Sequence, residues 1–194
     1  MLELVERVNS IVIGPGLGHT PANSEFLSTL LSQIDDEMPL VLDADALNIL
    51  SKSHKWWERL ENPAILTPHP AEMGRLMGIA AAEVQQDRGS VALEAAGKFG
   101  KVVVLKGAAT LIAAPDGRLM VSPWVNSGLA KGGSGDVLAG LIGGLLAQQP
   151  ENVFEMASLA VFVHGYAAEA ARDELGETGM RATDISDRLG YFSR

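Results

Sequence analysis

The chain has 194 residues, of which 47% are hydrophobic and 20% are charged. This balance is typical of a globular domain with a buried core and excludes an intrinsically disordered chain. The formal net charge is −9, which argues against nucleic acid or an anionic membrane as a partner, because both need basic contacts. The absence of cysteine excludes disulfides, thiolate catalysis and cysteine-ligated metal centres.

No targeting or membrane-spanning segment is expected. The first ten residues contain acids and lack an apolar signal-peptide core, and the longest uncharged apolar run covers residues 137–147. A run of that length is about half of what spans a bilayer. We therefore expect a cytoplasmic protein, and the lack of cysteine fits a reducing compartment.

Four short apolar runs predict strands that are covered on both faces, as in a parallel sheet. They occupy residues 10–13, 40–43, 64–67 and 102–105, and helical patterns occupy residues 22–34, 71–77 and 81–99. The alternation predicts an α/β fold with a mainly parallel sheet and helices on both faces, a three-layer α/β/α arrangement. Residues 110–114 and 118–121 flank a Pro-Asp-Gly turn and predict a hairpin. Helices are then expected at residues 136–148, 153–174 and 184–189.

A glycine-rich turn, Gly132-Gly133-Ser134-Gly135, leads into Asp136 and a predicted helix. Glycines let backbone N–H groups converge, and the positive end of the helix adds to them, so the turn predicts an anion site. An aspartate beside an anion is unfavourable unless it has a chemical task. The natural task is to take a proton from a hydroxyl that attacks a phosphorus atom held in the anion site. The alternative for Asp136 is a structural role as a helix N-cap.

A second candidate phosphate-binding segment, Lys106-Gly107-Ala108-Ala109-Thr110, directly follows the strand predicted at residues 102–105. Ligands of α/β proteins bind at the carboxyl ends of strands, so these residues can meet a phosphate or a ribose. Their order excludes a Walker A loop, in which glycine and lysine open a helix. Residues 101–135 include both candidate segments, and four of their five charged residues are basic although the whole chain is acidic. This local charge favours a phosphate ligand over a chance cluster.

Three other strand ends carry glycine-rich or polar segments. Gly14-Pro15-Gly16-Leu17-Gly18 predicts a turn that approaches a ligand, although its glycine spacing does not match the dinucleotide-binding fingerprint. Asp43 is a candidate for holding magnesium through water, and Asp45 is either a similar ligand or a helix N-cap. His69 lies between two prolines in a rigid loop. No spacing predicts a dedicated metal site, and His164 in an apolar helix is expected to be a core histidine.

Five motifs occur in an order that resembles the ADP- or ATP-dependent NAD(P)H-hydrate dehydratases. They are VIGPGLG, VLDADALN, ILTPHPAEMGRLMG, VVVLKGAAT and NSGLAKGGSGDVLAGLIGGLLAQ. This family belongs to the ribokinase-like superfamily and includes the carboxy-terminal domain of bifunctional NAD(P)HX repair enzymes. The resemblance implies a ribokinase-like fold and a repair lyase that uses ADP, or ATP, to phosphorylate the ring hydroxyl of hydrated NADH or NADPH. Loss of phosphate then restores the double bond.

The resemblance also implies roles for individual residues. Asp136 is the implied catalytic base and a substrate contact, and Gly132, Gly133, Ser134 and Gly135 form the implied anion hole for the transferred phosphoryl group. The nucleotide-binding positions are Lys106, Gly107, Ala108, Ala109, Thr110 and Gly135. Gly16 and His69 match substrate-binding regions. The implied co-substrate is ADP or ATP with Mg²⁺, and the implied substrates are NADHX and NADPHX.

Domains of this family begin with further strand–helix units, so residues 1–194 are expected to form one partial domain, truncated at its N-terminus. The strand nearest the missing units should present an unpaired edge or an exposed apolar face, which promotes aggregation or assembly. The family also implies a homo-oligomer and, in a longer protein, an epimerase domain. Two other functions stay open: a ribokinase-like kinase of a small vitamin alcohol, and a non-catalytic fragment that only binds nucleotide.

Overall fold

A computed structural model of the chain describes residue 5 and residues 7–190. Its centre is a six-stranded sheet whose strands lie in chain order from β1 to β6. The four strands β1 (Ile11–Ile13), β2 (Leu40–Leu42), β3 (Ala64–Leu66) and β4 (Val102–Leu105) are parallel neighbours. The strands β5 (Leu111–Ala113) and β6 (Leu119–Val121) form the antiparallel hairpin. The predicted parallel sheet and hairpin are thus confirmed, with each of the first three strands one residue shorter than expected.

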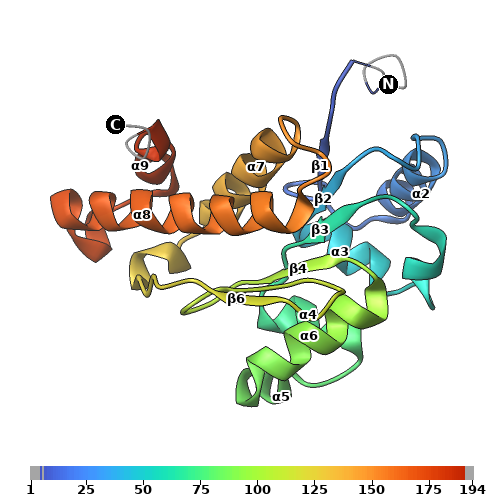
Figure 1. Cartoon of the computed structure of the whole chain (residues 1–194), viewed down its shortest axis with the longest axis horizontal. Coiled ribbons are helices and arrows are strands. Elements are labelled where there is room, and N and C mark those ends of the chain that lie inside the picture. The colour runs from blue at the N-terminus through green and yellow to red at the C-terminus, as the bar shows by residue number, and fades with distance from the viewer. Residues whose placement is uncertain (1–4, 6, 191–194) are drawn as a thin grey trace.

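Helices cover both faces of the sheet, as predicted (Figure 1). One face carries α2 (Pro21–Leu31), α3 (Ala44–Leu50), α4 (Pro70–Met77), α5 (Ala81–Gln86) and α6 (Arg88–Phe99). The other face carries α7 (Ser134–Leu146) and α8 (Val153–Gly179), and α9 (Ala182–Ser186) packs against these two. Two short 3-10 helices, η1 (Trp56–Arg59) and η2 (Ser127–Ala130), lie in connecting segments.

The strands are apolar throughout because both of their faces are buried. Leu40 and Leu42 of β2 pack into the core beneath α2 to α6, whereas Val41 between them packs against α7 and α8. In β4, Val103 and Leu105 join the first core, and Val102 and Val104 join the second. Successive side chains of a strand point to opposite faces, so a three-layer fold removes the polar alternation that a half-exposed strand would show.

The single helix predicted over residues 81–99 is wrong, because the structure divides it at Asp87. The backbone of Asp87 is not helical (φ −144°, ψ 72°), and its carboxylate accepts a hydrogen bond from the Ser90 amide at 3.0 Å. An aspartate side chain that caps a new helix competes with continuation of the old one. The prediction also missed α3 and η1. It ended the long helix at residue 174, and α8 runs to Gly179 with a kink at the non-helical Gly176 (φ 71°, ψ 156°).

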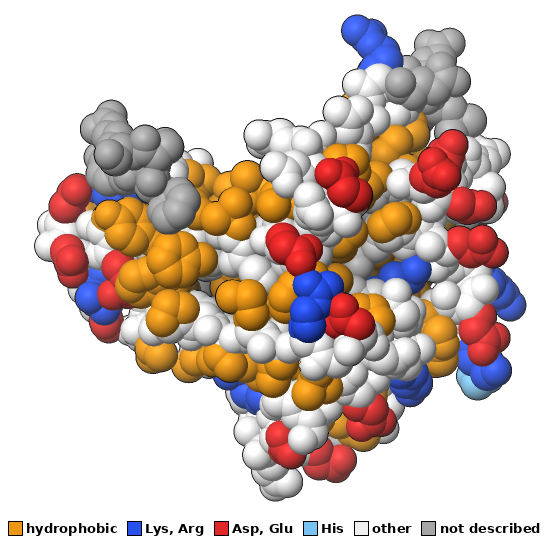
Figure 2. All heavy atoms as spheres, in the orientation of Figure 1, with side chains coloured by type: hydrophobic (Ala, Val, Ile, Leu, Met, Phe, Trp, Pro, Cys, Tyr) orange, Lys and Arg blue, Asp and Glu red, His pale blue; other side chains and the backbone are white. Residues whose placement is uncertain are grey.

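Both edges of the sheet carry exposed apolar side chains. The edge strand β1 leaves Val12 38% exposed, and the opposite edge strand β6 leaves Met120 47% and Val121 56% exposed. The expected exposed edge is therefore present at β1. Figure 2 shows a band of hydrophobic side chains along α8 on one face of the molecule. No helix within the described residues is long and apolar enough to cross a bilayer.

Two contacts hold α7 close to its neighbours. Ser10 donates its hydroxyl to the carbonyl oxygen of Gly143 at 2.8 Å, and a Cβ on Gly143 would lie 2.4 Å from Cγ2 of Val12. On the other side of α7, His164 of α8 is 6% exposed, and its Nε2 lies 3.0 Å from the carbonyl oxygen of Ser134. His164 is thus buried with a hydrogen-bond partner, as predicted for a core histidine.

The close packing at Gly143 gives a test of the fold. Gly143→Ala should lower the free energy of unfolding by about 1–3 kcal/mol, because the new methyl group meets the rigid strand side chain of Val12. Gly144→Ala is the matched control: it lies one residue along the same helix, with nothing within 4 Å of its new Cβ. That variant should gain up to about 1 kcal/mol from helix propensity. Urea unfolding measures both, and equal effects of the two substitutions would contradict the packing described.

The buried histidine gives a second test, of stability against pH. Desolvation lowers the pKa of His164 to about 4 from 6.5, so the unfolded chain takes up this proton first as the pH falls. The contribution of the neutral, buried His164 to the unfolding free energy is fully present above about pH 6.5. It declines as the pH falls toward about 4, by roughly 3 kcal/mol in total. Wild type should therefore lose more unfolding free energy on acidification than His164→Gln, measured by urea unfolding at several pH values. Parallel curves for the two proteins would refute the assignment.

Candidate active site

A cavity of about 640 Å³ lies at the carboxyl ends of β3 and β4, bounded on its far side by α8 and the start of α7. Eight residues that the sequence singled out line it: His69, Lys106, Gly107, Ala108, Thr110, Gly132, Ser134 and Gly135. Ligands of α/β proteins bind at this end of the strands. The two candidate phosphate-binding segments, separated by 21 residues in the chain, therefore share one cavity.

A buried ion pair lies at the base of this site. The ammonium of Lys106 is 2.7 Å from Oδ1 of Asp43 and 3.9 Å from Oε2 of Glu72. Both carboxylates are almost fully buried, whereas the side chain of Lys106 is 20% exposed. Asp43 therefore fixes the position of a cation that still reaches the cavity. Its Oδ1 atom is occupied by this pair, and the described residues contain no group of three or more acidic, His or Cys side chains that could hold a metal.

His69 begins α4 and is held by that helix. Its Nδ1 accepts hydrogen bonds from the amides of Ala71 (3.1 Å) and Glu72 (3.3 Å), while Oε2 of Glu72 accepts from the His69 amide at 2.8 Å. The ring Nε2 lies 3.3 Å from the other oxygen of Glu72. This reciprocal capping gives His69 a structural role at the rim of the cavity, and its predicted contact with substrate stays a prediction.

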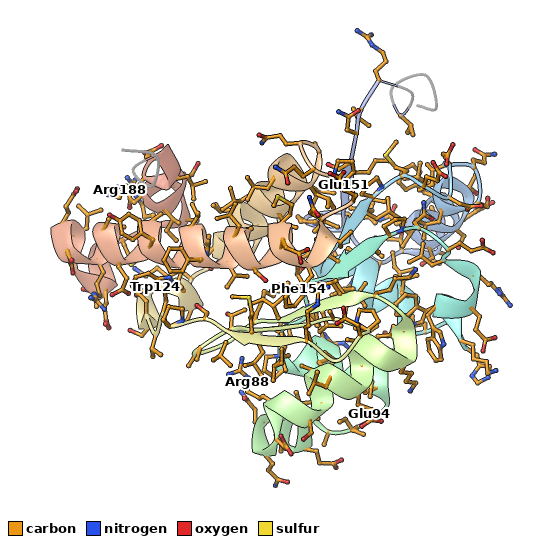
Figure 3. The ribbon with its side chains drawn as sticks, in the orientation of Figure 1. Arg88, Glu94, Trp124, Glu151, Phe154 and Arg188 are labelled. Atoms are coloured by element: carbon orange, nitrogen blue, oxygen red, sulfur yellow. The ribbon has the colours of Figure 1, made fainter. Side chains whose placement is uncertain are left out.

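Arg88, at the start of α6, supports the loop of residues 106–110 from below. Its guanidinium donates to the carbonyl oxygens of Ala108 and, at 3.0 Å, Leu105. Gly107 packs directly over it, with φ at +148° and a hypothetical Cβ only 2.9 Å from the guanidinium. Burial lowers the pKa of Arg88 from its usual value. Figure 3 shows Arg88 at the start of α6, on the face of the sheet away from α8. Because a side chain at position 107 would lie too close to the guanidinium, glycine is needed there for the loop to approach Arg88.

The turn of residues 132–136 leaves several amides free. Gly133 has φ at +90° and is the N-cap of α7. The amide of Ser134 donates to the carbonyl oxygen of Lys131 at 3.3 Å, so this amide is not available to the predicted anion site. Within the described residues, the amides of Gly133, Gly135 and Asp136 have no hydrogen-bond acceptor. A Cβ on Gly135 would lie 3.4 Å from Nζ of Lys106, which brings this turn against the buried ion pair.

Asp136 is the third residue of α7, and its side chain is exposed. The N-cap position is Gly133, so the alternative of Asp136 as a helix cap is wrong. The described residues supply no hydrogen bond or ion pair to its carboxylate. It does not line the cavity itself, but Gly135 before it does. Asp136 is thus an unpartnered acid beside the cavity, and its catalytic role stays a prediction.

Gly16, in the turn after β1, and Asp45, in the first turn of α3, do not line the cavity. The GPGLG turn approaches the end of β2 so closely that a Cβ on Gly14 would lie 1.8 Å from the carbonyl oxygen of Asp43. Asp45 accepts the amide of Gly18 at 2.7 Å and is not an N-cap, because α3 is capped at Asp43. The role of Asp45 is therefore to hold this turn. Gly16 (φ +68°) has open space around it, and its predicted substrate contact is untested.

The far wall of the cavity was not predicted. Trp124 packs against α8, where a Cβ on Gly165 would lie 2.1 Å from the indole ring, and its Nε1 donates to the carbonyl oxygen of Phe162 at 3.0 Å. Figure 3 shows Trp124 beneath α8, between that helix and the loop before α7. The signal in the sequence was Gly165 itself, a glycine beside a histidine in an otherwise alanine-rich helix.

The loop that carries this wall is tied to α8. Asn126 donates its side-chain amide to the carbonyl oxygen of Ala168 at 3.0 Å and accepts the amide of Gly128 at 2.9 Å. Lys131 donates to the carbonyl oxygens of Thr178 (2.5 Å) and Met180 (2.7 Å). Lys131 therefore caps the C-terminal end of α8. A ligand in the cavity meets less positive charge than the basic residues between 101 and 135 suggest.

Comparison with known proteins agrees with this geometry. A family model described as NAD(P)H-hydrate dehydratase matches residues 1–190. A bifunctional NAD(P)H-hydrate repair enzyme of Moorella thermoacetica is 41% identical over the whole of this chain, which covers 36% of that protein. The crystal structure of an ADP/ATP-dependent NAD(P)H-hydrate dehydratase from Bacillus subtilis, co-crystallised with ATP and Mg²⁺, is 38% identical and superposes with a TM-score of 0.83. The match covers 94% of this chain and 64% of that one.

A ribokinase-like superfamily protein of Enterococcus faecalis is 31% identical with a TM-score of 0.81, over 98% of this chain and 64% of that one. The predicted ribokinase-like fold is thereby confirmed. The chain spans between about a third and two thirds of the length of these relatives. Sequence motifs, fold and relatives agree, and the chain belongs to the NAD(P)H-hydrate dehydratase family.

Proposed function

We propose that this chain forms the nucleotide-binding and phosphoryl-transfer part of an ADP-dependent NAD(P)H-hydrate dehydratase. The substrates are the hydrated coenzymes NADHX and NADPHX, and the products are NADH and NADPH. The observation that carries the proposal is the meeting of the Lys106 loop, with its buried counter-ion, and the amides before Asp136 in one cavity. The names of its relatives support ADP or ATP as co-substrate.

The chemistry assigns each group a task. The ring hydroxyl of the substrate attacks the terminal phosphorus of ADP, AMP leaves, and elimination of the phosphate ester restores the double bond of the coenzyme. Asp136 takes the hydroxyl proton, since an alcohol is a poor nucleophile until that proton has an acceptor. The amides of Gly133 and Gly135, at the positive end of α7, stabilise the charge that develops on the transferred phosphoryl group. Lys106 donates hydrogen bonds to the nucleotide's phosphates, while Asp43 compensates its charge.

Magnesium enters this proposal with the nucleotide. The described residues offer no cluster for a metal, and Lys106 occupies Oδ1 of Asp43, the residue that the sequence suggested for a water-mediated contact. Mg²⁺ is commonly bound through substrate phosphates with few protein ligands, so ADP with Mg²⁺ is the co-substrate we propose. We also place the enzyme in the cytoplasm, as a homo-oligomer and, in a longer protein, beside an epimerase domain. A bifunctional relative supports the last of these.

The direct test is to incubate the protein with NADHX, ADP and Mg²⁺ and to follow the absorbance of NADH and the release of AMP. Formation of both supports the proposal. Phosphorylation of hydroxymethylpyrimidine, with no NADH formed from NADHX, would replace it with a vitamin-alcohol kinase. Binding of ADP without turnover of either substrate would leave the third reading, a non-catalytic nucleotide-binding protein.

Asp136→Asn separates catalysis from stability. The substitution keeps the shape of the side chain but removes the basic carboxylate, so turnover should fall by about 10²–10⁴-fold. ADP affinity should stay the same or improve, because a negative charge near the phosphates is lost. Unfolding free energy should change by at most about 1 kcal/mol, since only the interaction with the α7 dipole is altered.

The control for that variant is Asp36→Asn, which alters an exposed acid in the turn before β2. NADH formation, ADP binding and melting temperature are measured on both proteins. Full activity in Asp136→Asn would end the catalytic assignment.

A single and a double variant at Lys106 and Asp43 separate the structural from the functional role of the ion pair. Lys106→Met leaves Asp43 charged and unpaired in the core, which should cost roughly 3–5 kcal/mol of unfolding free energy. Adding Asp43→Asn removes that buried charge and should restore most of the stability. In both variants ADP affinity should be roughly 10–100-fold lower than in wild type, because the contact of Lys106 with phosphate is missing. Recovery of ADP binding together with stability would show that Lys106 acts only on the fold.

A further inference from the structure

Ser134 is held at three points, and the third of them has no part in the function proposed so far. Its amide donates to the carbonyl oxygen of Lys131, and its hydroxyl donates to the carbonyl oxygens of Leu129 (2.5 Å) and Lys131 (3.0 Å). Its own carbonyl oxygen lies 3.0 Å from Nε2 of His164, a residue thirty positions further along the chain on α8. Ser134 is 7% exposed and His164 is 6% exposed, so water competes little for these bonds.

The carbonyl of Ser134 and the amide of Gly135 belong to one planar peptide group. In a trans peptide the C=O and N–H bonds point in opposite directions and cannot rotate independently. A hydrogen bond that fixes the carbonyl of Ser134 therefore also fixes the direction of the Gly135 N–H. That amide has no acceptor among the described residues, and Gly135 lines the cavity beside Lys106.

The hydrogen bond also has a defined polarity. A carbonyl oxygen can only accept, so the ring nitrogen that faces it must carry the proton. Donation to the carbonyl pulls electron density along the peptide, and linked hydrogen bonds strengthen one another in this way. The N–H of Gly135 becomes a better donor to an anion as a result. Burial of the imidazole lowers its pKa to about 4, so the ring stays neutral near pH 7 and adds no net charge to the site.

We propose that His164 is a positioning residue for phosphoryl transfer: through the carbonyl of Ser134 it orients and polarises the Gly135 amide that binds the transferred group. This inference rests on the proposed function and adds a residue from α8 to it. The placement of the ring depends on the same helix packing that forms the cavity wall. Gly165, next in sequence, lets Trp124 lie against α8, and Asn126 ties the preceding loop to the same helix.

The test compares two substitutions of His164. His164→Gln keeps an N–H donor near the position of Nε2, whereas His164→Leu keeps an apolar side chain and removes the donor. We expect kcat for NADH formation to fall about 10–100-fold in the Leu variant, somewhat less than the loss of a whole oxyanion donor. The Gln variant should recover most of that loss. The Kd for ADP with Mg²⁺ should change little in either variant, because the orientation of the Gly135 amide affects mainly the phosphoryl group during its transfer.

Two further measurements keep the test independent of activity. In ¹H–¹⁵N NMR spectra, the Gly135 amide should shift in the Leu variant and return toward its wild-type position in the Gln variant. Ser158→Ala is the matched control: it removes another buried hydrogen bond of α8, to the carbonyl oxygen of Phe154, and should leave the Gly135 signal and kcat unchanged.

The outcomes separate the two proposals. If wild type makes no NADH from NADHX, the proposed function fails, and the Gly135 shift still decides whether His164 orients this amide. If both His164 variants lose melting temperature but keep wild-type kcat and an unshifted Gly135 signal, the role is packing alone and the inference is overturned. The same holds if the Gln variant is as impaired as the Leu variant while it remains folded.

Discussion

The buried pair of Lys106 and Asp43 is the interaction around which the site is arranged. It joins the carboxyl ends of β4 and β2, two strands that are separated by β3 in the sheet. Removing an ammonium and a carboxylate from water is unfavourable, and the pair is tolerated because each ion compensates the other at 2.7 Å. Neither residue can therefore be placed independently, and the strand ends are held at one separation. This separation sets the positions of the loops that follow β2 and β4.

Glycines allow other segments to approach this pair. Gly14 lets the first turn pass against the backbone of Asp43, where any side chain would overlap its carbonyl oxygen, and Gly135 lies at the start of α7 next to the ammonium of Lys106. Gly107 plays the same part beneath the loop, over Arg88. Gly14 and Gly107 thus solve the same steric problem, the close approach of backbone to a neighbouring group.

The sequence predicted those parts of the fold that are written in local patterns. The strands could be read because burial on both faces makes them wholly apolar, and the hairpin because its turn residues have fixed conformations. The break at Asp87 was missed, since the apolar period continues across it and only the capping bond of the carboxylate divides the helix. The rule that ligands bind at strand ends indicated Lys106, and the glycine-rich start of a helix indicated Gly135 as a second anion-binding position.

Contacts between distant segments could not be read in this way. His164 was expected in the core and lies there, yet nothing near it in the chain indicates that its partner is the Ser134 carbonyl. Lys131 appeared as a ligand-facing charge because composition cannot show that its ammonium caps the end of α8. A cap role for Asp136 was an open alternative in the sequence, and the backbone of Gly133 decided where α7 begins.

These contacts also decide how the cavity attracts an anion. Of the two lysines that line it, Lys131 is bound to the end of α8, and Lys106 is offset by Asp43, with the carboxylate of Glu72 nearby. The net charge around the Lys106 ammonium is therefore not positive, and simple ionic attraction cannot account for a phosphate ligand there. What remains is a set of directed donors: the N–H groups of Lys106, the free amides at the start of α7 and the dipole of the helix behind them. Dipoles held by the fold need no counter-ion and do not reorganise when charge moves during phosphoryl transfer. Their effect depends on direction, so a residue that fixes the orientation of one peptide group can matter as much as a residue that carries a charge.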